Sequence, residues 1–322
     1  MTLSCRTAGL TVEVEADGAR WGRFVEEACA GQLLGVGPAD VHVSISADPR
    51  PFDLAGLDPL TRGAWSDGAT VVMQDACASG ADLRLRPGPG GLEVEARARP
   101  APTTRVLTLL APSRAHLLWR AAMLQYPALW WAGVRGAVPL HVSALRVGGV
   151  AVVLAGPGGV GKSTLLREAM VRSAVGVSDN VCVTDGTRVH GLLEPLRGTD
   201  GTGRRMPHGR REEPWRERLD ALDVDRVLVL QRGSGEEVRV SPTSAADAAR
   251  VMTAGTYAAG ELRRYWAFAA TLALATGIGP AHPPVEDRAT VLAGSVPCAR
   301  VTLPAGPGTA VEDLLLEPAP GS

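Results

Sequence analysis

One short segment combines residue types that are suited to holding phosphate groups. Residues 156–163 read GPGGVGKS and satisfy the pattern GxxxxGK[ST], after the apolar run VAVVLA and before the amphipathic segment TLLREAMVRSA. Glycines let such a loop bring main-chain N–H groups close to phosphate oxygens, and the start of the following helix adds partial positive charge. The segment therefore predicts a phosphate-binding loop between a strand and a helix.

The lysine in this loop is the only one in the chain. Lys and Arg together number 33, and all the others are Arg. With this composition, chance produces on the order of 10⁻³ matches to the pattern. We expect Lys162 to reach the β- and γ-phosphates of a nucleotide and the Ser163 hydroxyl to ligate Mg²⁺. The residues expected around the nucleotide are Gly156, Gly158, Gly159, Val160, Gly161, Lys162, Ser163 and Thr164.

Two more polar side chains flank the loop along the sequence. His141 lies in the strand-like run PLHVSALRV before the loop, and Asp179 ends the next strand-like run after it. Because the carboxyl ends of neighbouring strands meet at the nucleotide in such folds, Asp179 can bind Mg²⁺ through water or accept the proton of an attacking hydroxyl. The alternatives are a satisfied core histidine at His141 and a turn-forming residue at Asp179.

The spacing of these motifs resembles that of a known kinase family. Leu140-His141, the loop 156–163 and Ser178-Asp179 match in type and spacing the catalytic domain of HPr kinase/phosphorylase and its HPr-kinase-related relatives. The N-terminal domain differs from that of classical HPr kinases and is closer to that of the divergent relatives found near peptide-modification genes.

The resemblance implies a fold, a reaction and a set of roles. The fold would be α/β, with a P-loop HPr-kinase-like catalytic core preceded by a small α+β N-terminal domain. The reaction would transfer the γ-phosphoryl group of ATP, with Mg²⁺, to a Ser or Thr hydroxyl of a protein or ribosomally made peptide. Asp179 would be the general base, and His141 would orient that carboxylate.

Two positions depart from the family pattern. The second Asp of the family pair is Asn180 here, which can ligate a metal through its carbonyl oxygen but brings no charge. The family also has a downstream Glu that ligates Mg²⁺. Its counterpart here would be Glu194 in LLEPLRG, although this residue lies closer to the loop in sequence than the family's Glu does. The alternative is that Glu194 is an ordinary loop carboxylate. Two other functions stay open: a small-molecule kinase acting on an amino acid, a sugar or an antibiotic alcohol, and a non-catalytic nucleotide-binding regulatory module.

A basic segment offers further phosphate ligands. Residues 198–218 are rich in Gly and Arg and predict a mobile loop. Arg204 and Arg205 are the best candidates to reach the γ-phosphate, because the later arginines have Glu neighbours in the sequence. The alternative is a solvated loop with mutual ion pairs.

The remaining patterns predict the supporting elements and the domain limits. We expect a small α+β domain over 1–110, the kinase core over 111–305 and a tail over 306–322. Alternating runs and turn residues predict strands and two hairpins, one over residues 81–98 and one formed by the two runs that join at residues 148 and 149. Helices are expected over 20–31, 112–133 and much of 243–276.

Composition excludes several classes of protein. The net charge is −1 and no basic run is present, so a nucleic-acid partner is not expected. The five cysteines form no CxxC pair, and the start of the chain has no apolar leader, which favours the reducing cytoplasm. The apolar stretch at 117–134 contains Arg120 and Pro127 and predicts a buried or half-buried helix rather than a membrane span. The sequence leaves the oligomeric state open, a homo-oligomer included.

Overall fold

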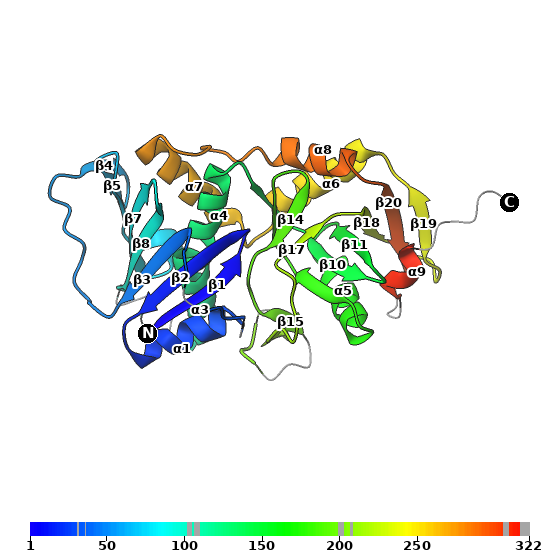
Figure 1. The fold of residues 1–322 in the computed structure, drawn as a ribbon, viewed down its shortest axis with the longest axis horizontal. Coiled ribbons are helices and arrows are strands. Elements are labelled where there is room, and N and C mark those ends of the chain that lie inside the picture. Colours follow the sequence, from blue (N-terminus) through cyan, green and yellow to red (C-terminus); the bar gives the residue numbers. More distant parts are fainter. Residues whose placement is uncertain are drawn as a thin grey trace. The chain divides into compact units, whose positions relative to one another are not determined.

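Alternating apolar and polar residues form the strands of the first sheet. In β2 (Leu10–Ala16), Val12 and Val14 are buried whereas Glu15 is exposed, as in a strand covered on one face. The computed structural model describes residues 1–30, 32–35, 37–101, 105, 110–198, 203–206, 209–304 and 309–315. The protein is a mixed α/β protein with several mixed sheets, the largest of eight strands (Figure 1).

The chain divides into two units, each assembled from separated segments. Unit 1 contains Met1–Gly136, Leu193–Trp215 and Arg264–Pro283, and unit 2 contains Ala137–Leu192, Arg216–Arg263 and Pro284–Ser322. The domain limits predicted at residues 110 and 305 remain predictions. Of the predicted tail, the structure describes residues 309–315, which include α9 (Val311–Leu315); residues 306–308 and 316–322 lie outside the described part.

The eight-stranded sheet of unit 1 has the order β1-β2-β3-β8-β7-β6-β5-β4. Pairing is parallel between β2 and β3 and between β3 and β8, and antiparallel elsewhere. The predicted hairpin of β7 and β8 is present. The strands are β1 (Thr2–Thr7), β2 (Leu10–Ala16), β3 (Val41–Ser46), β4 (Asp58–Thr61), β5 (Ala64–Ser66), β6 (Val71–Met73), β7 (Ala81–Gly88) and β8 (Gly91–Ala98).

Helices pack on the apolar face of this sheet. Trp21 of α1 meets Trp119 of α3 edge to face, with ring centroids 5.2 Å apart. The predicted helix over 112–133 is present, but its middle turns are π-helical, a local widening of the helix. The helical elements that the structure delimits in unit 1 are α1 (Gly18–Ala28), the short 3₁₀ turn η1 (Ala76–Ala78), α3 (Pro112–Trp119), the π-helical η2 (Arg120–Gln125), α4 (Tyr126–Val134) and α7 (Arg263–Thr276).

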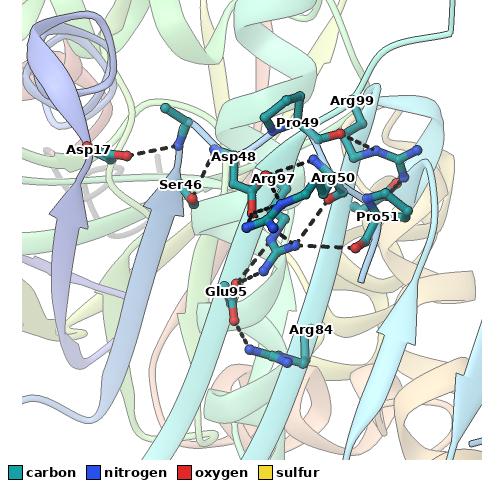
Figure 2. A network of polar contacts seen from close by, with 12 residues as sticks. Asp17, Ser46, Asp48, Pro49, Arg50, Pro51, Arg84, Glu95, Arg97 and Arg99 are labelled. Carbon is teal, nitrogen blue, oxygen red and sulfur yellow. Dashed lines mark hydrogen bonds and ion pairs between the residues drawn. The ribbon is translucent and has the colours of Figure 1, made fainter. Parts of the chain in front are cut away.

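A network of charged side chains lies along the same sheet (Figure 2). Arg97 donates to Glu95 at 2.8 Å, Glu95 also pairs with Arg84, and Arg50 donates to Asp48 at 2.9 Å. The hydrogen bonds from Arg50 lower the pKa of Asp48 to about 2. Both Arg84 and Arg97 lie over the ring of Phe52. The network thus joins the segment after β3 to β7 and β8 and helps to fix their register.

Unit 2 is built on a six-stranded sheet with the order β12-β10-β11-β18-β20-β19. The hairpin of β10 and β11 is present as predicted, and β11, β18 and β20 run parallel. In Figure 1, α5 lies on one side of this sheet and α6 with α8 on the other. The strands are β10 (Ser143–Val147), β11 (Val150–Ala155), β12 (Val175–Ser178), β18 (Arg226–Arg232), β19 (Arg239–Pro242) and β20 (Cys298–Leu303). The helices are α5 (Lys162–Val171), α6 (Ala245–Ala258), α8 (Val285–Gly294) and α9.

A second, four-stranded sheet in unit 2 corrects one prediction. The sequence predicts a single strand through His141, but β9 (Val138–Leu140) and β10 belong to different sheets. The amide of Val142 donates to the Leu140 carbonyl at 3.0 Å, and this tight turn sends the chain from one sheet into the other. His141 therefore lies between two strands. The antiparallel order is β17-β14-β13-β9, with β13 (Cys182–Thr184), β14 (Arg188–Gly191) and β17 (Ala221–Asp223).

The basic segment also contains structure where a loop is predicted. In unit 1, β15 (Leu196–Gly198) and β16 (Arg211–Glu213) form an antiparallel pair. Residues 199–202 and 207–208 of this segment lie outside the described part. Within the ranges that the structure describes, no helix is both long and apolar enough to cross a membrane.

Candidate functional site

The loop 156–161 joins β11 to α5 and needs glycine at several positions. Gly156, Gly159 and Gly161 have φ angles of 150°, 78° and 118°, which side-chain-bearing residues rarely adopt. A Cβ on Gly156 would lie 2.7 Å from the carbonyl oxygen of Leu230. The backbone conformation of this loop therefore favours glycine at these three positions.

Lys162 begins α5, and its side chain turns back into the loop. Its Nζ donates to the carbonyl oxygens of Gly156 at 2.8 Å and Pro157 at 3.3 Å. The residue is 6% exposed. Burial lowers the pKa of its ammonium to about 8, while the negative charges of Asp179 and Glu261 act in the opposite direction. A buried cation thus lies inside the loop, within electrostatic reach of the predicted carboxylate.

Asp179 follows β12 directly, as predicted, and is 1% exposed. Two hydroxyl groups hold the turn that carries it. Ser143 donates to the main-chain carbonyl of Asp179, and Ser178 donates to that of Val181 at 2.7 Å. Both bonds anchor the main chain of this turn, and the carboxylate that it carries lies within electrostatic reach of the Lys162 ammonium.

His141 and Asn180 form a second pair at the same place. His141 Nε2 lies 3.1 Å from Asn180 Oδ1. The main-chain amide of His141 donates at 2.9 Å to the hydroxyl of Thr256 on α6, which in turn donates to the Met252 carbonyl. Asn180 is 7% exposed, and its Nδ2 has no hydrogen-bond partner within the described part of the chain. The structure thus brings His141 to Asn180, the residue next to Asp179.

Three other predicted residues belong to unit 1, and their contacts lie within it. The Glu194 carboxylate pairs with Arg197 at 3.0 Å. Arg204 pairs with Glu27 and lies 3.8 Å from a carboxylate oxygen of Glu212. Arg205 forms an isolated bridge with Arg211 through its main chain. The proposed contacts of Glu194 with metal and of Arg204 and Arg205 with phosphate remain predictions.

Arg218, from the end of the basic segment, holds the strands behind the site. Its guanidinium is 2% exposed and donates at 2.9 Å to both the Val177 and the Gly191 carbonyls. A Cβ on Gly191 would lie 2.3 Å from the Val177 oxygen. Arg218 therefore joins β12 to β14 just before Asp179, so its cation serves the protein framework rather than a solvated loop.

Sequence reasoning missed two charged residues near the loop. Arg232 ends β18, and its Nη2 lies 3.0 Å from the place that a Cβ on Gly161 would take. Glu261, between α6 and α7, acts electrostatically on Lys162. The parallel strands β11 and β18 end at the same edge of the sheet, and this rule could have identified Arg232 from the run RVLVLQR. Nothing local in the sequence marks Glu261.

The oxygen-bearing side chains near the loop suit a magnesium ion that is also bound by phosphates better than a metal ion bound by protein side chains alone. The described residues contain no group of three or more His, Cys, Asp and Glu side chains that could hold a metal. Magnesium in nucleotide sites commonly takes one or two protein oxygens together with phosphates and waters. Ser163, the second residue of α5, and Asp179 suit that arrangement. Asn180 Oδ1 faces His141 instead, which weakens the predicted role of Asn180 as a ligand.

No protein-family model matches this chain, and a search of curated proteins finds no match.

Proposed function

We propose that this protein is a kinase that transfers the γ-phosphoryl group of ATP, with Mg²⁺, to a Ser or Thr hydroxyl of a protein or peptide. Its core would be an HPr-kinase-like P-loop core in unit 2. One observation carries the proposal: the buried ammonium of Lys162, inside a glycine-rich loop, lies within electrostatic reach of the buried carboxylate of Asp179. This is the pair of charges that phosphoryl transfer to an alcohol requires.

In this proposal, Lys162 and the loop bind the phosphates, whereas Asp179 activates the acceptor hydroxyl. In the structure, Lys162 occupies the loop through two carbonyl contacts, which phosphate oxygens would replace. The main-chain amides of the loop and the first turn of α5 would bind the same oxygens. When bound, Mg²⁺ supplies charge neutralisation at the β- and γ-phosphates.

Asp179 would accept the proton of the acceptor hydroxyl as its oxygen bonds to phosphorus. The bond between the γ-phosphorus and the bridging oxygen breaks, and ADP leaves with the electron pair. The pair of His141 and Asn180 would keep the turn after β12 in place, and thereby the direction of the carboxylate. Little covalent chemistry is left to the protein, so placement and electrostatics carry the reaction.

The test compares binding with transfer. Calorimetry with ATP and Mg²⁺ measures binding, and mass spectrometry of a library of Ser- and Thr-containing peptides measures transfer. We expect Lys162→Ala to lose both, and Asp179→Asn to keep binding while losing transfer. Asp185→Asn, in the exposed turn between β13 and β14, is the matched control and should change neither.

Each departure from this pattern has a definite meaning. Absence of ATP binding by the wild-type protein would refute the proposal. Binding without transfer to any peptide, but with ADP release stimulated by a small alcohol, would favour a small-molecule kinase. Binding without any transfer, with Asp179→Asn still functional in the cell, would favour a regulatory nucleotide-binding module.

A further inference from the structure

Arg232 places a second cation beside the glycine-rich loop. It is the last residue of β18, and its Nη1 donates to the Pro304 carbonyl at 2.7 Å. Its Nη2 lies 3.0 Å from the place that a Cβ on Gly161 would take, so the glycine leaves room for the guanidinium. The side chain is exposed at the mouth of the loop.

The guanidinium is not used by an ion pair in the part of the chain that the structure describes. No carboxylate there lies within 4.0 Å of Arg232, and its hydrogen bond goes to a neutral main-chain carbonyl. A guanidinium has five donors in a rigid fork. Most of its capacity therefore stays available for an anion, and the planar fork suits phosphate oxygens.

The order of the strands separates Arg232 from Asp179. The sheet runs β12-β10-β11-β18, and the loop leaves the end of β11. Since β10 is antiparallel to both β11 and β12, the chain leaves β11, β12 and β18 at the same edge of the sheet. Asp179 follows β12 on one side of the loop, and Arg232 ends β18 on the other.

We propose that Arg232 binds the end of the donor that is not transferred, at the phosphate next to the nucleoside, so that the donor is a nucleoside triphosphate rather than pyrophosphate. This rests on the proposed function. The reacting phosphate must lie beside the carboxylate that activates the acceptor, and the chain of phosphates then extends across the loop, away from β12. Its far end reaches Gly161, the first turn of α5 and the free donors of Arg232.

The experiment measures affinity for two ligands by calorimetry in the presence of Mg²⁺: ATP, and pyrophosphate, which has no nucleoside end. Arg232→Met should weaken ATP binding about tenfold to a hundredfold, as expected for losing a charge-assisted hydrogen bond, and pyrophosphate binding less than about threefold. Arg239→Met is the matched control, because this arginine lies on β19, beyond β20 in the same sheet, and is also exposed. It should leave both affinities unchanged.

A second variant distinguishes loss of the positive charge from loss of the hydrogen bond to the Pro304 carbonyl. Arg232→Gln keeps a donor for the Pro304 carbonyl but removes the charge, and it should lose ATP affinity as the Met variant does, with an unchanged melting temperature. ATP affinity within about threefold of the control, in the Gln variant or in a folded Met variant, would overturn the inference. Equal weakening of ATP and pyrophosphate would also overturn it, because Arg232 would then act on the transferred end. Failure of the wild-type protein to bind ATP would instead refute the proposed function.

Discussion

Replacing Lys162 by methionine should make the protein more stable while removing its affinity for nucleotide. Lys162 is 6% exposed, and burial lowers the pKa of its ammonium from 10.5 to about 8. The difference corresponds to about 3 kcal/mol by which the charged form disfavours the folded state. Methionine has a similar volume but loses the two hydrogen bonds to the loop carbonyls, worth about 1–2 kcal/mol together. We therefore expect the free energy of unfolding to rise by about 1–2 kcal/mol at pH 7.

The sign of the pH dependence follows from the two pKa values. The folded-state pKa lies below the unfolded-state value, so the penalty is complete below about pH 8 and fades as the pH rises towards 10.5. In that range Lys162 becomes neutral first in the folded protein. The stability of the wild-type protein should therefore approach and then exceed that of the variant.

Urea unfolding followed by circular dichroism at pH 7 and pH 10 measures this difference. Arg146→Met on β10 is the control, because it exchanges an exposed cation for the same side chain. Two results would show that the buried ammonium does not destabilise the folded protein. One is a Lys162→Met protein that is less stable than the wild type at pH 7, and the other is a stability difference that is the same at both pH values. The loop would then lack the property expected of a site kept for its ligand rather than for stability.

Three further predictions concern the protein framework. The pKa of Asp48 is about 2 in the folded protein and 3.8 in the unfolded chain, so its ionised carboxylate stabilises the fold above about pH 4, and this contribution is lost as the pH falls towards 2. In the Asp48→Asn variant, the melting temperature should therefore depend less on pH between pH 4 and pH 2 than in the wild-type protein. Arg218→Met leaves two buried carbonyls without a donor and should lower the free energy of unfolding by about 2–4 kcal/mol in urea titrations; a loss below about 0.5 kcal/mol would contradict the role given to it. Arg120 donates to Glu212 at 2.7 Å with both side chains buried, so Arg120→Met alone should cost about 3–5 kcal/mol, and the double variant with Glu212→Leu should cost clearly less.

Local pattern was enough to predict much of unit 2. The apolar runs and the turn at residues 148 and 149 predict the hairpin of β10 and β11, and the glycines predict the loop that follows. Asp179 follows its strand as expected, because the end of a short apolar run is visible in the sequence itself. These features depend on residues close to one another along the chain.

The features that the sequence did not predict depend on distant contacts. The turn at Val142 separates β9 from β10, and the signal for it is the pairing of β9 with β13, some forty residues later. The role of Arg218 is set by carbonyls on two other strands. Likewise, Cys77 donates to the Arg264 carbonyl within unit 1, across most of the sequence. No periodicity within a short window can report such contacts.

The interleaving of the two units bears on how this chain is made. A ribosome releases the eight strands of the large sheet first, yet α7 and the rest of the segment up to Pro283 emerge only after most of unit 2 has been made. The nascent sheet must therefore wait for its last helix with part of its apolar surface still exposed, which is the condition that recruits chaperones. Cutting the gene at residue 136 would make this waiting state permanent, so an isolated amino-terminal fragment should aggregate unless the last segment is supplied with it.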